Sequence, residues 1–301
     1  MENRKIILIG KNVEKSPSPE MHNAGLNALN LPFQYKAISI PEDAFKEQFL
    51  NLKYEAHGFN VTIPYKEKII PFLDHLTQTG EKLQAVNTVY FKNHESFGEN
   101  TDIAGFMQSL QESDFPSALY PASFSTTPVK NKTAFIFGAG GAAKASIEGL
   151  IQMGVQRFII WSRSDERIAA LRVWLQKRNH SEIKPDKRTG HEIQFIAGRV
   201  SKERFQSSII ECYIIVNASP LEAIKEIPWF SEIKLKQEAI VVDWVYSPIK
   251  TPWLEKADSN KGKTVEGYKI LLYQGMKAFE LWTQEKAPAE VMKKTLLKVL
   301  Q

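Results

Sequence analysis

The sequence is poor in cysteine, in long apolar runs and in excess charge of either sign. Cys212 is the only cysteine among 301 residues, so an internal disulfide and a cysteine-based metal cluster are both excluded. We therefore expect no metal and a reducing, cytoplasmic setting. No run approaches the roughly 18 apolar residues of a membrane span, and the opening MENRKIILIG lacks the basic start and long apolar core of a signal peptide.

The charge balance is nearly even, with 39 Lys and Arg against 34 Asp and Glu and a net charge of +5. Because this excess is small and spread along the chain, it does not indicate a nucleic-acid or membrane partner. The composition, 43% hydrophobic and 24% charged, is ordinary for a soluble globular protein. At about 100–200 residues per domain, the length indicates two domains.

The N-terminal third alternates the patterns of strands and helices. Apolar runs and helical spacing predict, in turn, strands over 5–10, 33–40 and 59–63, helices over 41–52 and 66–76, and a hairpin over 87–100. Strands joined by helices pair in parallel, because a parallel crossover needs about a dozen residues or more. This third is therefore expected to form an α/β unit.

A second alternating unit follows residues 114–131, which are rich in proline, serine and threonine and typical of a linker. Its expected elements are strands over 133–138, 157–162, 191–198, 213–219 and 239–246, helices over 141–153, 165–178 and 201–210, and a helical C-terminus over 268–301. These strands are continuous apolar runs, as in a parallel sheet buried on both faces. The fold class predicted is α/β, with two α/β domains.

A glycine-rich loop lies between the strand at 133–138 and the helix that follows it. Gly138, Gly140 and Ala143 match G-x-G-x-x-G/A, and Ala139, Gly141 and Ala142 complete the loop. Small residues allow a tight turn and let backbone amides approach a pyrophosphate, beside the partial positive charge of a helix N-terminus. The loop predicts a Rossmann-type dinucleotide site, the alternative being a turn made for packing.

The end of the next strand indicates which dinucleotide is bound. NAD-binding units usually place a carboxylate there, but this chain has Ser162-Arg163-Ser164, with Arg167 shortly after. Guanidinium groups bind a 2′-phosphate that a carboxylate would repel, which favours NADP. The alternative is that Arg167 is a solvated helix residue and that Asp165 and Glu166 serve only the start of the next helix.

Polar clusters follow or precede the strands of the first unit. Strand ends carry the ligands of open α/β sheets, so we expect these clusters to share a pocket. Taken singly, each residue has a structural alternative, with Ser18 and Asp102 as helix N-caps and Thr62 and Asn87 as loop formers. The four clusters are Ser16–Asn23, Asn60–Lys66, Ala85–Val89 and Gly98–Gly105.

Seven motifs that follow one another along nearly the whole chain resemble the shikimate dehydrogenase family. They are, in order, S-x-S-P-x-x-H-N, N-V-T-x-P-x-K, A-V-N-T, N-T-D-x-x-G, G-A-G-G-A, N-A-S-P-L and D-W-V-Y-S-P. The resemblance implies reversible, NADP-dependent reduction of 3-dehydroshikimate to shikimate, a step of aromatic amino acid (chorismate) biosynthesis. It also implies a substrate-binding and catalytic domain over 1–106, completed by 267–301, and a doubly wound NADP domain over 107–266.

The resemblance assigns a role to individual residues of this chain. Lys66 and Asp102 would be the catalytic pair, since an ammonium beside a carboxylate can protonate or hydrogen-bond the alkoxide that hydride addition creates. Ser16, Ser18 and Tyr246 would bind the substrate carboxylate or lie near it, and Thr62, Asn87, Asp102 and Gln274 would bind ring hydroxyls. The cofactor contacts implied are Gly138, Ala139, Gly140, Gly141, Ala142, Ser162, Arg163, Ser164, Arg167, Trp244 and Gly267.

Several positions depart from the family pattern. They are Lys15, Gln78, Ser162, Glu222 and the bulky segment 268–270 beside the expected nicotinamide end. These departures leave two alternatives open, a quinate/shikimate dehydrogenase with relaxed cofactor use and a non-catalytic member that binds a ligand. A monomer and a homodimer are both compatible with the sequence.

Overall fold

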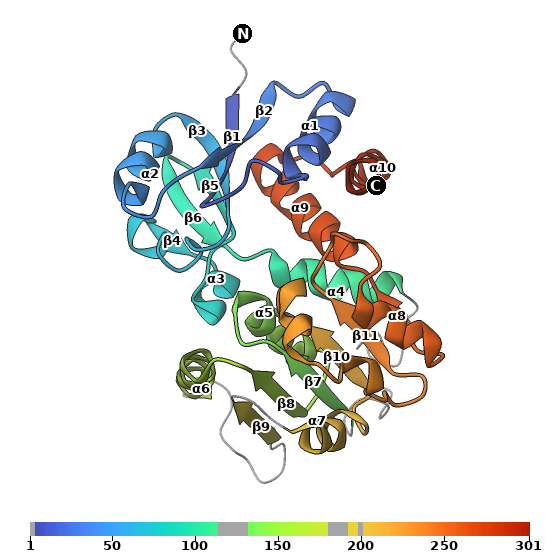
Figure 1. Cartoon of the computed structure of the whole chain (residues 1–301). Helices are drawn as coiled ribbons and strands as arrows, with labels where there is room; N and C mark the ends of the chain where they lie inside the picture. Colours follow the sequence, from blue (N-terminus) through green and yellow to red (C-terminus); the bar gives the residue numbers. More distant parts are fainter. Residues whose placement is uncertain (1–3, 114–131, 180–191, 198–200) are drawn as a thin grey trace. The chain divides into compact units, whose positions relative to one another are not determined.

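The computed structural model describes residues 4–113, 132–179, 192–197 and 201–301. Its contacts divide the chain into two compact units, one formed by Met1–Gly105 with Leu271–Gln301 and the other by Phe106–Ile270. Each unit has its own six-stranded sheet with helices packed around it (Figure 1). The expected linker at 114–131 lies outside the described residues.

The sheet of the first unit is mixed. Its strand order is β2-β1-β3-β5-β6-β4, in which β1 pairs in parallel with β2 and β3, whereas β5 pairs antiparallel with β3 and β6. The strands are β1 (Arg4–Gly10), β2 (Phe33–Ser39), β3 (Ala56–Val61), β4 (His75–Leu76), β5 (Thr88–Lys92) and β6 (Glu95–Glu99). The predicted strands and hairpin are confirmed, and the antiparallel register places Asn60 opposite Thr88 and Thr88 opposite Glu99.

Helices pack on this sheet through aromatic and aliphatic side chains. The ring of Phe45 in α2 stacks on that of Tyr65 with centroids 4.2 Å apart, and Phe49 lies edge-on to Phe59 of β3. The first helix was not predicted, because its buried face holds His22 and Gly25 beside few large apolar residues. The helices here are α1 (Ser18–Ala28), α2 (Phe45–Lys53), α3 (Gln78–Leu83) and α10 (Ala289–Leu300).

The prediction of a helix over 66–76 is wrong. The structure has a single 3-10 turn, η1 (Ile70–Phe72), followed by the short edge strand β4 (His75–Leu76). Pro71 explains the difference, since it has no N–H to donate to the carbonyl four residues earlier and its ring clashes with that carbonyl. The spacing of Ile69, Ile70 and Leu73 reflects packing on the sheet instead of a helical face.

The sheet of the second unit is entirely parallel. Its order is β12-β11-β10-β7-β8-β9, the doubly wound Rossmann order, with the reversal of strand order between β7 and β10. The strands are β7 (Thr133–Phe137), β8 (Arg157–Ser162), β9 (Glu192–Ala197), β10 (Ile214–Asn217), β11 (Ile240–Asp243) and β12 (Lys263–Val265). The predicted fold class is confirmed, and β12 is a strand that the sequence did not reveal.

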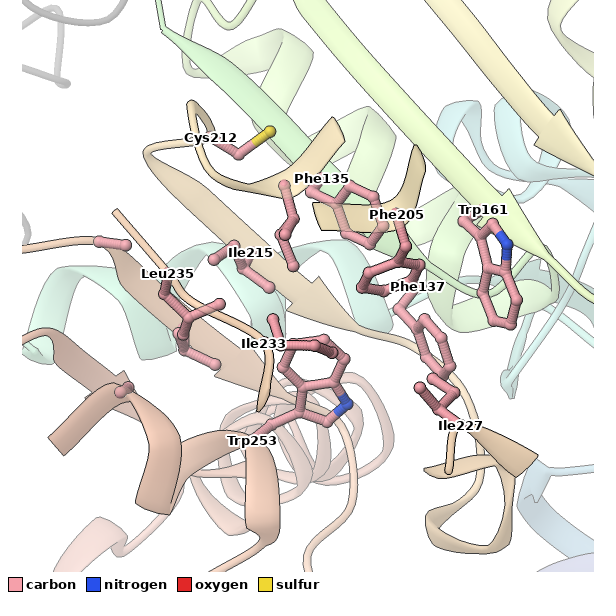
Figure 2. Packing of buried hydrophobic residues seen from close by; sticks show 14 of the residues in the cluster. Phe135, Phe137, Trp161, Phe205, Cys212, Ile215, Ile227, Ile233, Leu235 and Trp253 are labelled. Atoms are coloured by element: carbon pink, nitrogen blue, oxygen red, sulfur yellow. The ribbon is translucent and has the colours of Figure 1, made fainter. Parts of the chain in front are cut away.

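An aromatic-rich core supports one part of this sheet. Figure 2 shows the ring of Trp161 beside that of Phe137, with Phe205 and Trp253 packed close by. These side chains come from β7, β8, α7 and α8, so the core joins the strands to the helices that connect them. The helices here are α4 (Asp102–Glu112), α5 (Gly141–Gln152), α6 (Asp165–Asn179), α7 (Lys202–Ile209) and α8 (Pro252–Ser259), with 3-10 helices η3 (Leu221–Glu226) and η4 (Phe230–Glu232).

The C-terminal helical segment consists of two helices, α9 (Gly267–Thr283) and α10 (Ala289–Leu300). Pro288 stands immediately before α10, and the residue before a proline is disfavoured in helical conformation. The boundaries of the two compact units fall within α4 and α9. Across the described ranges, no helix is both long enough and apolar enough to cross a membrane.

Candidate functional site

Lys66 and Asp102, which are 36 positions apart, form an ion pair in the first unit. The Lys66 Nζ lies 2.7 Å from Asp102 Oδ2, and the two side chains are 23% and 9% exposed. Lys66 is fixed by the turn after β3, where its carbonyl accepts a bond from the amide of Val86. Asp102 is the first residue of α4, and Asn100 accepts its backbone N–H, so Asp102 is not the cap of its helix.

The Asn87 side chain holds the other oxygen of Asp102. Its Nδ2 donates to Asp102 Oδ1 at 2.8 Å and to Thr101 Oγ1 at 3.0 Å, while its Oδ1 accepts the backbone N–H of Thr101 at 2.8 Å. Gln274 of α9 lies at the same place, with its Oε1 3.4 Å from Asn87 Nδ2 and 3.3 Å from Thr101 Oγ1. The structure thus brings together Lys66, Asn87, Asp102 and Gln274.

Three further polar side chains extend this cluster into the interior, and the sequence did not point to them as a group. Tyr35 Oη donates to Asn60 Oδ1 at 2.7 Å, and Asn60 Nδ2 donates to the Asn87 carbonyl at 3.0 Å and to Thr88 Oγ1 at 3.1 Å. Thr88 Oγ1 in turn donates to Asn87 Oδ1 at 3.0 Å. The only sequence signal was that Asn60 and Thr88 belong to two of the polar motifs.

Ser16, Ser18 and Thr62 follow the ends of β1 and β3. Ser18 begins α1 and is buried, and its backbone N–H donates to Ser16 Oγ at 3.3 Å. Thr62 is half-buried, and its N–H donates to the Ile9 carbonyl of β1, which fixes it beside the end of that strand. Neither serine hydroxyl is a helix cap in this arrangement, since Pro17 occupies the cap position of α1.

Tyr246 belongs to the second unit, three residues after β11. It is half-buried, and burial raises the pKa of its hydroxyl. β11 ends at the buried Asp243, which accepts hydrogen bonds from Asn217 Nδ2 at 2.8 Å and from Thr251 Oγ1 at 2.5 Å. Burial raises the Asp243 pKa to about 6, while the hydrogen bonds from Thr251, the Val245 amide and Asn217 oppose the shift.

The glycine-rich loop lies where the strand order of the second sheet reverses. Gly138 has φ of +126°, and a Cβ there would lie 2.6 Å from the Ala218 carbonyl oxygen after β10, so the turn requires glycine. At Gly140 and Gly141 an added Cβ would meet nothing within 4 Å. Packing therefore does not explain these two glycines, whereas the approach of a ligand to the start of α5 does.

A pocket opens beside this loop. Ser162 and Arg163 at the end of β8, Arg167 of α6 and Gly138 line it, and the remaining lining residues are Phe137, Ala139, Trp161, Ala218, Ser219, Pro220 and Ala223. Two guanidinium groups beside a hydroxyl suit a phosphate, and the open glycine turn suits a pyrophosphate. These residues therefore fit a dinucleotide with a phosphorylated ribose.

Ser164 has a second role at the start of α6. Its Oγ accepts the backbone N–H of Arg167 at 3.2 Å and donates to Glu166 Oε2 at 2.6 Å, and this bond from Ser164 lowers the Glu166 pKa. The Glu166 carboxylate is thus bound to one of the hydroxyls expected to contact the cofactor. Ser162 is buried, and its Oγ accepts the Ser164 N–H at 3.3 Å.

Trp244 and Gly267, both expected to contact the cofactor, have clear packing partners. The Trp244 indole N–H donates to Ser146 Oγ of α5 at 2.8 Å, and its ring stacks on Phe106. A Cβ on Gly267 would lie 2.4 Å from the Val245 carbonyl oxygen and 2.7 Å from that of Asp243, so glycine is needed for close approach to β11. Cofactor contact at either position stays a prediction.

The departures from the family pattern also have positions in the structure. Glu222 is exposed in the first turn of η3, and Gln78 begins α3 after the capping residue Thr77. Lys269 pairs with Glu266 at 3.1 Å and donates to Ser113 Oγ at 3.2 Å. Among the described residues, no group of three or more His, Cys, Asp or Glu side chains is arranged to hold a metal ion.

Comparison with known proteins gives a consistent result over the length of the chain. Residues 8–89 match the shikimate dehydrogenase substrate binding domain, and residues 267–297 match the shikimate 5′-dehydrogenase C-terminal domain. The shikimate dehydrogenase (NADP(+)) of Dictyoglomus turgidum is 34% identical over 295 residues, covering 97% of this chain and 96% of that protein.

Solved structures agree with these matches. The shikimate 5-dehydrogenase of Thermus thermophilus, in complex with NADP(H) and shikimate, is 25% identical with a TM-score of 0.75, covering 99% of this chain and 100% of that one. The enzyme of Listeria monocytogenes, in complex with shikimate and NAD, is 28% identical with a TM-score of 0.79, covering 97% of this chain and 96% of that one. The chain belongs to the shikimate dehydrogenase family.

Proposed function

We propose that this protein is an NADP-dependent shikimate dehydrogenase, which reversibly reduces 3-dehydroshikimate to shikimate. The observation that carries the proposal is the Lys66–Asp102 ion pair of 2.7 Å, whose carboxylate is held on its other oxygen by Asn87. Family membership gives the substrate and cofactor, and the pair gives the means of proton transfer. We further propose a role in aromatic amino acid biosynthesis, as the family resemblance implies, and a cytoplasmic location, as expected from the sequence.

The chemistry needs a hydride and a proton. NADPH supplies the hydride when bound, and the ketone carbon accepts it while the carbonyl π electrons move to oxygen. Lys66 hydrogen-bonds this oxygen and gives it a proton, and Asp102 stabilises the ammonium and orients it. In the direction of oxidation, neutral Lys66 takes the proton from the hydroxyl. A positioned acid–base group of this kind contributes about 10²–10⁴-fold in rate.

The first unit supplies most of the proposed substrate contacts. Ser16 and Ser18 donate their hydroxyls to the carboxylate of the substrate, and the family resemblance adds Tyr246 as a residue for the same group. The ring hydroxyls are bound by Thr62, Asn87, Asp102 and Gln274. This assignment makes residues 1–106, completed by 267–301, the substrate-binding and catalytic domain.

Residues 107–266, which lie within the second unit, are proposed to form the cofactor-binding domain. The amides of Gly138 to Ala142 contact the pyrophosphate, and Ser162, Arg163, Ser164 and Arg167 bind the phosphorylated ribose. Support comes from the open space at Gly140 and Gly141 and from the pocket lined by the two arginines. Trp244 and Gly267 complete the proposed set.

The test is to follow reduced nicotinamide absorbance with shikimate or quinate as substrate and NADP or NAD as cofactor, in wild type and Lys66→Ala. We expect rapid turnover with shikimate and NADP, weak turnover with NAD, and a loss of about 10²–10⁴-fold in the variant. Faster turnover with quinate would identify a quinate/shikimate dehydrogenase. No turnover of folded protein with any pair would favour a non-catalytic binding protein.

A further inference from the structure

In the buried polar cluster next to Asp102, the hydrogen-bond donors are oriented toward the Asp102 carboxylate. Two backbone groups fix the orientation of the two asparagine amides in this cluster. The Thr101 backbone N–H can only donate, and it lies 2.8 Å from Asn87 Oδ1, so this atom is the amide oxygen and Nδ2 must face Asp102. The Asn87 backbone carbonyl can only accept, and it lies 3.0 Å from Asn60 Nδ2, so that atom is the amide nitrogen. Neither amide can be flipped without opposing like groups.

The remaining protons follow from these two assignments. Asn60 Oδ1 faces Tyr35 Oη at 2.7 Å and can only accept, so the tyrosine must donate. Thr88 Oγ1 accepts from Asn60 Nδ2 at 3.1 Å and gives its own proton to Asn87 Oδ1 at 3.0 Å, which is nearer than Thr101 Oγ1 at 3.4 Å. The donors therefore run in one sense, from Tyr35 through Asn60, Thr88 and Asn87 to the Asp102 carboxylate.

Burial makes this direction persistent. Tyr35, Asn60, Asn87 and Thr88 are at most 6% exposed, so water does not compete for their donors, and a buried polar group left without a partner is costly. The geometry comes from the sheet, since the antiparallel register of β3 and β5 places Asn60 opposite Thr88. The neutral, buried ring of His22 stacks on Tyr35, the first donor of the series, with ring centroids 4.4 Å apart.

We propose that Tyr35, Asn60 and Thr88 are positioning residues for the reaction. They hold the Asn87 amide so that its Nδ2 donates to Asp102 Oδ1, which leaves Asp102 Oδ2 alone to orient Lys66. This inference rests on the proposed function of the Lys66–Asp102 pair. Thr88 is the link to test, because its hydroxyl joins Asn60 to the Asn87 amide oxygen, which also accepts from the backbone N–H and the hydroxyl of Thr101. That hydroxyl contributes to the geometry of the transition state and not to the recognition of substrate.

The test compares Thr88→Val, which keeps the shape and removes the hydroxyl, with Thr88→Ser, which restores it. Tyr35→Phe removes the first donor, and Tyr90→Phe is the matched control on the same sheet. We expect Thr88→Val to lower kcat about tenfold or more, since small displacements of a catalytic group reduce rate strongly, with KM for shikimate changed less than about threefold. Thr88→Ser should recover to within about threefold of wild type, Tyr35→Phe should lie between, and Tyr90→Phe should match wild type.

Thermal melting shows that each variant is folded at the assay temperature. A folded Thr88→Val protein with kcat within about twofold of wild type, or a KM increase that accounts for the whole loss, would overturn the proposal. Side-chain amide hydrogen exchange by NMR gives a second readout that needs no activity. The Asn87 amide protons should exchange slowly in wild type and Thr88→Ser and quickly in Thr88→Val.

The two proposals fail in different ways. A wild-type protein without dehydrogenase activity would refute the proposed function, and the exchange experiment would still decide the positioning role. Equal exchange of the Asn87 amide in wild type and Thr88→Val would refute that role whatever the activity. An active wild type with the expected exchange and kcat pattern supports both.

Discussion

Each unit of the molecule buries an aspartate beside its candidate site, and the two are held in opposite ways. Asp102 in the first unit is paired with the Lys66 ammonium and accepts from Asn87. Asp243 in the second unit accepts only from neutral donors, namely Asn217, Thr251 and the Val245 amide, and no described lysine or arginine forms an ion pair with it. Burial accordingly raises the pKa of Asp243 to about 6.

The difference teaches how the two sites are built. A buried carboxylate with a cation partner serves charge chemistry, because removal of either partner leaves an uncompensated charge. A buried carboxylate among neutral donors serves to join strands, since Asp243 links the ends of β10 and β11 to the start of α8 through Asn217 and Thr251. Under the proposed function, the first unit holds its proposed catalytic group through the Lys66 ion pair and the Asn87 amide, whereas Asp243 joins structural elements of the second unit.

Of the two aspartates, Asp102 is expected to give the larger effect when it is changed to asparagine. The amide keeps the shape of the side chain and removes the negative charge, so Lys66 loses its partner and the Asn87 amide faces a second amide. We expect kcat to fall about 10²–10³-fold, with the protein still folded. Steady-state kinetics with shikimate and NADP measures it, and a loss below about threefold would show that the ion pair is structural.

Asp243→Asn tests the other side of the comparison through the pH dependence of stability. The folded pKa of about 6 lies above the ordinary 3.8, so the native state holds the proton more tightly than the unfolded chain. The stability contributed by this group is therefore present at low pH and is lost as pH rises through about 6. A pKa difference of about two units corresponds to about 3 kcal/mol, which is the upper limit of the pH-dependent change in unfolding free energy from this group.

Urea unfolding of wild type and Asp243→Asn at about pH 4 and pH 7 measures this effect. The free energy of unfolding of the variant minus that of wild type should increase by up to about 3 kcal/mol from pH 4 to pH 7, because only wild type loses the contribution of Asp243. Asp74 provides a contrast, because hydrogen bonds from Ser96 lower its pKa from 3.8 to about 2, so its contribution is lost only below about pH 4 and stays nearly constant between the two pH values. A difference independent of pH would contradict the assignment for Asp243.

Arg167→Ala tests the second site directly. Loss of a charge-assisted hydrogen bond to phosphate costs about 1.5–3 kcal/mol, so KM for NADPH should rise about tenfold or more while KM for NADH changes little. Arg204→Ala is the matched control, because Arg204 has the same position relative to its capping serine at the start of α7. Equal effects on both cofactors would mean that Arg167 does not read the 2′-phosphate.

The smallest effect is expected from Glu166→Gln. Glu166 accepts the Ser164 hydroxyl at 2.6 Å, so its negative charge is held at one of the hydroxyls proposed to bind the 2′-phosphate. Removal of the charge should lower KM for NADPH about two- to threefold and leave KM for NADH unchanged, since an exposed charge interaction is weak. Glu203→Gln, the same position in α7, should change neither value, and a rise in KM for NADPH would contradict the account.

Much of the second unit follows from its sequence. Continuous apolar runs predicted five of its six strands, and the Gly138 loop predicted a Rossmann-type dinucleotide site, which the structure places at the reversal of strand order. The three-residue strand β12 is too short to give a pattern. The first unit was less predictable, because Pro71 breaks an apparent helical pattern and α1 buries a histidine and a glycine.

The candidate catalytic site shows the same limit. Lys66, Asn87 and Asp102 stand in polar motifs at strand ends, the family resemblance implied their roles, and the structure brings the three side chains together. The cluster behind them was not predicted, because Tyr35, Asn60 and Thr88 come together only through the pairing of β3 with β5 and the position of β2. The orientation of each amide depends on backbone groups of other segments, and periodicity carries no information about such contacts.

The most direct test of the central claim is the rate of the hydride-transfer step in a single turnover, with wild type and Lys66→Ala saturated with shikimate and NADP. We predict that the step slows about 10²–10⁴-fold in the variant, while the dissociation constant for shikimate changes less than about tenfold. A step within about threefold of the wild-type rate would show that Lys66 does not carry the proton.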